Sequence, residues 1–279
     1  MYHINHVKTL QKTTMVIAVS LASSEQAELW GVVRNAQLVR VYFPGWTLRI
    51  YMKQVAATSD VDSESSRARV ISTLLVLGAD IVYVDTRLAG HWWSYMIADD
   101  LSVDFALVRK PNSRLCERDA MAVKDWVELC EKAPHVAVHC LRDTTYQGSR
   151  PIMHGLWGVR PSVLHHLLGG RSLMSLIQQF VNDSCGRDDD DADDGCEPSD
   201  FLSQMLWPVV QRDAVVCHDS VSHDVWPNSL YFQRIHSHTV AQCVGAEYDG
   251  HEQLVTGCDS DGHSPTDIVS NDNVPELLV

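Results

Sequence analysis

The stretch Val103-Asp-Phe-Ala-Leu-Val-Arg-Lys-Pro-Asn-Ser-Arg114 decides how the rest of the chain is interpreted. Its first half is short and mostly apolar, which is typical of a buried strand, and residues 109–114 form a polar turn directly after it. In open α/β sheets, ligands bind just outside the carboxyl ends of the strands. We therefore expect the turn at 109–114 to face a ligand.

The alternation of predicted elements around this stretch indicates a parallel sheet covered by helices. An apolar strand is predicted at Met15–Leu21, a helix begins after Ser23 and Ser24, and a second strand follows at Leu48–Met52, so the chain opens with a βαβ unit. Further elements are expected in this order: a helix at Val70–Leu77 that Gly78 stops, a buried strand at Ala79–Val84, an aromatic cluster at Gly90–Tyr95, a helix with an apolar stripe from Ala120 to Cys130 that Ser113 opens as a capping box, a strand at Val136–Leu141, a turn at Pro151–Gly158, a helix at Val163–Val181 that Gly169 and Gly170 split, a helix from Phe201, and a strand at Ala214–Cys217. The predicted fold class is α/β, with a single Rossmann-like mixed sheet flanked by helices.

Length and charge limit the domain organisation and the partners. A chain of 279 residues can form one large domain, and we expect it over residues 14–250, with an acidic loop insertion at about 182–199. Residues 1–13 are expected to be a flexible start, and residues 251–279 a disordered acidic tail. The formal net charge of −14 argues against nucleic acid or an anionic membrane as the main partner, because both require clustered Lys and Arg.

The cysteines and the hydropathy predict a cytoplasmic protein. The eight cysteines include no Cys-x-x-Cys pair, so ordinary reduced thiols are expected. The longest apolar run near the start, Met15–Ala22, is far shorter than the roughly 20 residues of a membrane span. It also lacks a clear cleavage site, so neither a transmembrane segment nor a secretory signal is predicted.

An ordered series of short motifs carries a family resemblance over roughly residues 15–252. The motifs are Val33-Arg34-Asn35-Ala36, the run from Tyr42 to Tyr51, Val103-Asp104, Arg109 with Ser113-Arg114, the helix from Glu117-Arg118 to Trp126, Arg142-Asp143, Pro151-Ile152, Gly155-Leu156-Trp157-Gly158, Asp200-Phe201-Leu202, Trp207-Pro208, His218-Asp219 and Val244-Gly245. This series resembles a poorly characterised family of glycosyltransferase-like proteins of the nucleotide-diphospho-sugar type, with a GT-A-like fold. The resemblance implies an enzyme that moves a sugar from a nucleotide-sugar donor to an acceptor that the sequence does not identify.

The resemblance also shows where this chain departs from the family. The family's turn reads Arg-Asp-x-Asp-Ser-Arg, and its two aspartates resemble the acidic pair that holds a divalent cation, Mn or Mg, against the donor diphosphate. Lys110 and Asn112 stand at these positions. Neither supplies a carboxylate, and Lys110 places a positive charge where the metal would bind.

Two interpretations of this turn remain open from the sequence. Arg109, Lys110 or Arg114 could hold the diphosphate directly, because Lys and Arg can stabilise phosphate without a metal. Alternatively, the chain is a catalytically lapsed relative that binds a nucleotide or sugar, or serves interaction with another protein.

The resemblance assigns roles to further residues, each with a structural alternative. The candidate catalytic residues are Asp143 and Asn112. Asp143 could act as a base, and its structural alternative is to close a turn. The candidate donor-binding residues are Asn35, Arg49, Arg109, Lys110, Arg114, Trp157 and Gly158. Trp157 could stack on the sugar beside glycines that permit close approach, or it is a core residue in a tight turn. His218 and Asp219 are the candidate metal ligands, with a packed strand-end His as the alternative.

Overall fold

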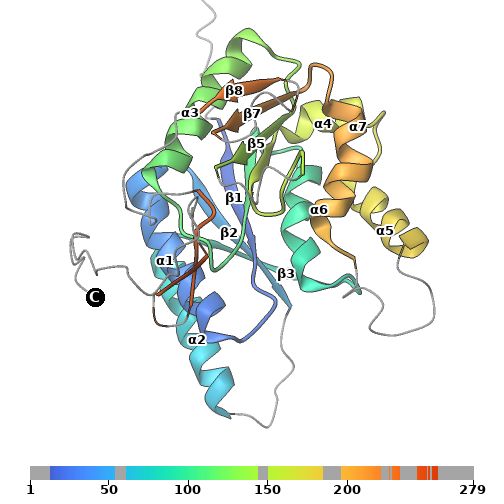
Figure 1. Ribbon diagram of the computed structural model, residues 1–279. Helices are drawn as coiled ribbons and strands as arrows, with labels where there is room; N and C mark the ends of the chain where they lie inside the picture. The colour runs from blue at the N-terminus through green and yellow to red at the C-terminus, as the bar shows by residue number, and fades with distance from the viewer. Residues whose placement is uncertain are drawn as a thin grey trace, which may run out of the picture.

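The computed structural model describes residues 13–53, 61–143, 150–184, 196–220, 226, 228–232, 244–249, 251 and 253–256, with residues 61–64 and 254–256 described by their backbone. These residues form an α/β structure with helices on both faces of a central sheet (Figure 1). The predicted fold class of a mixed sheet flanked by helices is confirmed.

The central sheet has eight strands, and all but one run parallel. In spatial order they are β3 (Asp80–Val84), β2 (Thr47–Lys53), β1 (Met15–Ser20), β4 (Phe105–Arg109), β6 (Trp157–Val159), β5 (Val138–Arg142), β7 (Val215–Asp219) and β8 (Ser229–Tyr231). Only β6 is antiparallel to its two neighbours within this sheet. The carboxyl ends of the other strands therefore meet at one edge, where the turn at 109–114 begins.

Two helical layers cover the sheet (Figure 1). One face carries α1 (Gln26–Tyr42), α2 (Val61–Val76) and α3 (Glu117–Lys132), whereas the other carries η1 (Gly90–Asp99), α4 (Pro161–Leu167), α5 (Leu173–Ser184) and the continuous helical segment of α6 (Pro198–Phe201), η4 (Leu202–Leu206) and α7 (Trp207–Val210). Strand β1 contributes side chains to the core on both faces of the sheet, because successive side chains point to opposite faces. Ile17 and Val19 pack towards α1, and Val16 and Ala18 pack towards η1.

Glycines end the helices where the sequence predicted. Gly78 follows α2 with φ +83°, and Gly169 and Gly170 separate α4 from α5 with φ +65° and +83°. Residues other than glycine rarely adopt this left-handed conformation, so each site terminates a helix.

Three local predictions are wrong. The Pro151–Gly158 stretch was expected to be a turn, but Trp157–Val159 forms the buried strand β6, which is too short for its periodicity to be recognised. The predicted buried strand β3 lies at the sheet edge and has one buried residue. The capping box at Ser113 does not form, because α3 starts at Glu117 without a side-chain cap and Ser113 Oγ donates to the Ala246 carbonyl at 3.4 Å.

A small second sheet follows the central one. Strands β9 (Glu247–Tyr248) and β10 (Leu254–Thr256) pair antiparallel, so ordered pairing extends past the expected start of the tail at residue 251. Residues 1–12, most of the acidic loop at 185–195, and residues 257–279 lie outside the described residues.

The prediction that the cysteines are reduced is wrong for three of the five cysteines in the described part of the chain. Cys140 and Cys217 are in-register partners on β5 and β7, and they form a disulfide with a Cα–Cα distance of 4.7 Å. Cys196 is disulfide-bonded as well, whereas Cys116 and Cys130 are free and buried. Disulfides persist mainly in oxidising compartments. Reduced cysteines therefore no longer support the expected cytoplasmic location.

No helix in the described ranges has both the length and the hydrophobicity needed to cross a bilayer.

Candidate functional site at the carboxyl edge

The turn after β4 is fixed by helix α1. The fully buried Asn35 donates its Nδ2 to the carbonyl oxygens of Pro111 at 3.2 Å and Ser113 at 2.8 Å, and its Oδ1 accepts the Leu115 amide at 3.1 Å. A Cβ on Gly31 would lie 2.1 Å from the Pro111 carbonyl oxygen, so the helix and the turn are in direct backbone contact. Asn35, which was predicted to bind the donor, thus holds the backbone of the turn from helix α1.

Arg109 is committed to structural contacts. Its guanidinium makes a two-point pair with Asp119 at 2.9 and 2.8 Å, and Nη1 donates to the carbonyl oxygens of Val108 at 2.8 Å and Trp157 at 2.9 Å. The residue is 3% exposed. These contacts join the end of β4 to α3 and β6.

The two positions that replace the family's aspartates share one carboxylate, which belongs to Glu247. Lys110 Nζ lies 2.7 Å from Glu247 Oε1, and Asn112 Nδ2 donates to Oε2 at 3.3 Å. Ser113 also forms an isolated β-bridge with Glu247. Glu247 is absent from the predicted site residues, because no spacing in the sequence connects it to Lys110, 137 positions away.

Arg114 also contacts the segment that contains Glu247. Its backbone amide donates to the Ala246 carbonyl at 3.2 Å, and its guanidinium carbon lies 5.0 Å from the centre of the Tyr248 ring. The Tyr248 amide in turn donates to the Asn112 carbonyl at 3.0 Å. The segment 246–248 therefore lies along the turn and brings Lys110, Asn112 and Arg114 together.

Asp143, the predicted base, is held by four donors. Arg118 binds both carboxylate oxygens at 2.8 and 2.7 Å, Ser220 Oγ donates at 2.8 Å, and the Val244 amide donates at 3.2 Å. The residue is 5% exposed. The Asp143 carboxylate therefore connects the end of β5 to α3, to Ser220 and to the backbone at Val244.

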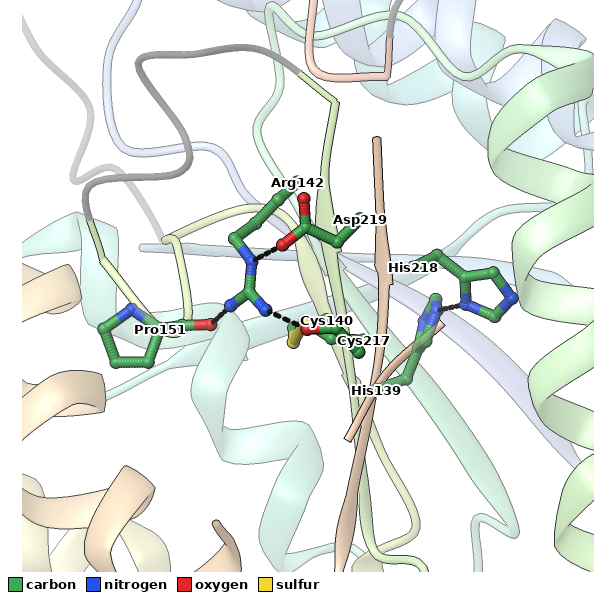
Figure 2. Close-up of a disulfide and its surroundings, with 8 residues drawn as sticks. His139, Cys140, Arg142, Pro151, Cys217, His218 and Asp219 are labelled. Carbon is green, nitrogen blue, oxygen red and sulfur yellow. Dashed lines mark hydrogen bonds and ion pairs between the residues drawn. A yellow bond between two sulfur atoms is a disulfide. The ribbon is translucent and has the colours of Figure 1, made fainter. Parts of the chain in front are cut away.

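Asp219 is paired with an arginine beside the disulfide (Figure 2). Arg142 Nε donates to Asp219 Oδ2 at 2.6 Å, Nη2 donates to Ser229 Oγ at 3.1 Å, and Nη1 donates to the Pro151 carbonyl. Both members of the pair are fully buried, and burial lowers the pKa of Arg142, an effect that Asp219 opposes. The Asp219 carboxylate thus neutralises an arginine in the protein interior.

His218 faces away from Asp219. Its Nδ1 lies 2.9 Å from His139 Nε2, and its Nε2 lies 3.7 Å from Asp125 Oδ2. Burial lowers the pKa of both histidines. Figure 2 shows the histidine pair on the opposite side of the strands from Arg142 and Asp219, because neighbouring residues of a strand alternate in direction. His218 and Asp219 therefore do not converge on a common ion.

Trp157, Gly158 and Arg49 are packed or paired away from Lys110, although the Trp157 carbonyl accepts a hydrogen bond from Arg109 at the start of the turn. Trp157 is fully buried, and a Cβ on Gly158 would lie 2.8 Å from Leu107 Cδ2, so both are packed inside the sheet layers. Arg49, on the amino-terminal half of β2, binds Asp100 at 2.7 Å and Asp80 at 3.5 Å. The structure thus does not bring these three residues together with Lys110.

The side chains at this edge do not fit a divalent cation. The turn offers an ammonium group, an amide and one carboxylate, and the carboxylate is bound to the ammonium group. Nowhere among the described residues do three His, Cys, Asp or Glu side chains gather as a metal site would require. The Mn or Mg expectation therefore has no donor set at the turn.

The comparisons with known protein families and with curated proteins give no match. Among solved structures, the chain is similar to a glycosyltransferase involved in the glycosylation of the major capsid of PBCV-1, at 10% identity, with 74% of this chain and 82% of that chain covered and a TM-score of 0.41. It is also similar to the mannosyltransferase PcManGT from Pyrobaculum calidifontis in complex with GDP-Man and Mn2+, at 15% identity, 76% and 56% coverage and a TM-score of 0.43. A third similar structure is mouse xyloside xylosyltransferase 1, at 10% identity, 75% and 85% coverage and a TM-score of 0.40. Similarity at this level assigns no role to a residue of this chain.

Proposed function

We propose that this chain is a glycosyltransferase-type protein that binds a nucleotide-sugar donor at the turn 109–114 without a divalent cation. The observation that carries the proposal is the Lys110 ammonium group at the carboxyl end of β4, in the position that the resembling family gives to a metal-binding aspartate. In this arrangement Lys110 supplies the positive charge that a cation would bring to the donor diphosphate.

The Lys110–Glu247 pair leaves the ammonium group able to exchange partners. The two side chains are 33% and 23% exposed, so the pair is screened by water and holds its members weakly compared with a buried pair. A diphosphate carries more negative charge than one carboxylate and competes for the same ammonium group. The Asn112 amide and the Arg114 guanidinium lie on the same turn and add hydrogen-bond donors.

Binding of nucleoside diphosphates tests this proposal. Isothermal titration calorimetry with UDP, GDP and their sugar conjugates, in EDTA and in Mn2+, is expected to show binding that EDTA does not weaken. Lys110→Met should weaken that binding at least about 10-fold, because it removes a charge-assisted contact and leaves Glu247 beside the phosphate. Lys124→Met is the matched control, since Lys124 is 75% exposed and pairs with Glu128 on α3. Binding that requires Mn2+, or that Lys110→Met leaves unchanged, contradicts the proposal.

A second candidate is a catalytically lapsed protein that binds the donor and transfers nothing. The observation that favours it is Asp143, whose carboxylate is occupied by Arg118, Ser220 and Val244 and is therefore poorly placed to take a proton. An assay of donor hydrolysis and sugar transfer separates the two candidates. Its readout is the nucleoside diphosphate that is released. Turnover by the unmodified protein excludes the lapsed form.

Restoring the family's acidic pair sharpens this distinction. In the double variant Lys110→Asp with Asn112→Asp, two new carboxylates would stand beside Glu247. Manganese-dependent turnover that appears only in this variant identifies the natural chain as a lapsed enzyme.

A further inference from the structure

His154 lies in the loop that enters β6 and is held on several sides. Its backbone amide donates to Ser199 Oγ at 3.0 Å, and its Nδ1 lies 3.1 Å from the Tyr95 hydroxyl. The imidazole also stacks on the Tyr95 ring, with centroids 5.8 Å apart and planes 17° from parallel. These contacts fix both the position and the orientation of the ring.

The same loop touches Lys110. A Cβ on Gly155 would lie 2.7 Å from Lys110 Cγ and 3.3 Å from its backbone nitrogen, so the residue after His154 packs directly on the lysine. Burial lowers the pKa of His154 to about 3, with Lys110 and His91 contributing in that order. The histidine is therefore neutral at physiological pH, and it does not repel the lysine beside it.

The hydrogen bond to Tyr95 couples the direction of the Tyr95 hydroxyl to the tautomer of His154. Burial raises the pKa of Tyr95 well above its usual value, so the hydroxyl keeps its hydrogen. When this hydroxyl donates to Nδ1, the imidazole proton resides on Nε2.

Nε2 is available to a ligand. The residue as a whole is of intermediate burial, although burial of its ring lowers its pKa, and among the described residues no group forms a hydrogen bond with its Nε2. An N–H donor on the loop that packs against Lys110 suits an anionic oxygen, because the charge attracts the anion and the donor sets its position.

We propose that His154 donates its Nε2–H to a phosphate oxygen of a nucleoside diphosphate bound at Lys110, and that Tyr95 is a positioning residue that fixes this tautomer. The proposal rests on the proposed function, since it deepens the donor site there. The carboxyl edge then recognises a diphosphate with one cation and one neutral donor from two different loops.

Three variants test the contact by calorimetry with the nucleoside diphosphate that the natural protein binds best. His154→Ala should weaken binding about 10-fold or more, as expected for a lost hydrogen bond to a charged group. His154→Gln, whose amide retains an N–H donor, should recover most of that loss. The control is His166→Ala, which removes an exposed histidine from α4.

The outcomes separate this inference from the proposed function. If the natural protein binds no nucleoside diphosphate, the proposed function fails and this inference fails with it. If it binds and His154→Ala binds equally well, only the role of His154 is overturned.

Tyr95→Phe provides a readout that a merely structural residue would not change. Nitrogen-15 chemical shifts of the His154 ring, identified by the loss of its signals in His154→Gln, should show the Nε2–H tautomer from pH 5 to 8 in the natural protein. In Tyr95→Phe a mixture of tautomers is expected, with diphosphate binding weakened and the thermal stability close to that of the natural protein. A proton on Nδ1 in the natural protein, or a charged ring at pH 6, overturns the proposal.

The groups that face His154 are Tyr95 and His91 from η1 and Lys110 from the turn after β4. Their charges set the pH range of the test. Burial raises the pKa of Tyr95 well above its usual value, so its hydroxyl keeps its proton throughout pH 5–8. The measurement is repeated in His91→Gln, where the tautomer of His154 should be unchanged.

Discussion

Single residues at the carboxyl edge neutralise one another across long sequence separations. Arg118 binds Asp143, Arg142 binds Asp219, and Lys110 binds Glu247. The first two pairs are buried and fully engaged, so either partner alone would leave an uncompensated charge inside the protein. The Lys110 pair is more exposed, and this is why the ligand contact is assigned to it.

Asn35 is the residue on which the shape of the turn depends most directly. Asn35→Ala would leave the Pro111 and Ser113 carbonyls and the Leu115 amide without their buried partner. We expect the free energy of unfolding to fall by about 2–4 kcal/mol, measured by chemical denaturation, because each unsatisfied buried group costs about 1–3 kcal/mol and water recovers part of it. The exposed Arg40 on the same helix provides the control Arg40→Ala, and equal stability of the two variants would contradict this role.

Among the elements, the neighbouring strands β5 and β7 are joined by side-chain bonds as well as by backbone pairing. Their five in-register positions include the disulfide on one face and, one step further towards the carboxyl edge, the pair of Arg142 and Asp219 (Figure 2). The opposite face carries the His139–His218 contact. The two strands are thus joined by a covalent bond, an ion pair and a histidine pair within a few residues.

The disulfide between these strands should stabilise the fold. It closes a loop with a sequence separation of 77, for which loop-closure entropy predicts a stabilisation of about 4 kcal/mol. We expect Cys140→Ala with Cys217→Ala to lower the melting temperature in non-reducing buffer. Dithiothreitol should act slowly on the native protein, because both sulfur-bearing residues are buried.

Peptide mass mapping without reduction checks the bond itself. It should recover a linked pair of peptides containing Cys140 and Cys217, and Cys116 should be found as a free thiol. A fully reduced protein purified from an oxidising compartment would refute this pairing.

The molecule as a whole should lose stability in mild acid. Burial lowers the pKa of His139, His154 and His218 in the folded state, so an unfolded chain binds more protons than the folded one below about pH 6.5. Their contribution to stability is therefore complete above the unfolded pKa and declines as the pH falls from there towards the folded values. Each such histidine contributes a slope of up to about 1.4 kcal/mol per pH unit.

Denaturation at a series of pH values checks this expectation. The free energy of unfolding should fall between pH 7 and pH 5, and His154→Gln should reduce the slope by close to one proton. His166→Ala, which changes an exposed histidine, should keep the natural slope. A slope that His154→Gln does not alter would show that this imidazole is not held neutral.

The sequence by itself determined the layers of the fold. Apolar runs such as Met15–Leu21 and Val136–Leu141, helical stripes such as Ala120–Cys130, and glycine stops at Gly78 and Gly169 are local patterns, and each produced the expected strand or helix. It also located the turn at 109–114 and the replacement of its aspartates. The strands, helices and turn depend on neighbouring residues only, so periodicity predicts them directly, whereas the replacement of the aspartates was implied by the family resemblance.

Only the tertiary structure decided which of the candidate residues face one another. Glu247 lies 137 positions from Lys110, and Asp219 lies 77 positions from Arg142, so no spacing in the chain indicates either contact. The antiparallel β6 has three residues, too few for a period, and its place between β4 and β5 follows from pairing with both. Sheet register likewise directed His218 and Asp219 to opposite faces and joined Cys140 to Cys217. Long-range contacts therefore pair the charged motif residues with one another. The turn around Lys110 is the part of this edge that we propose binds a ligand.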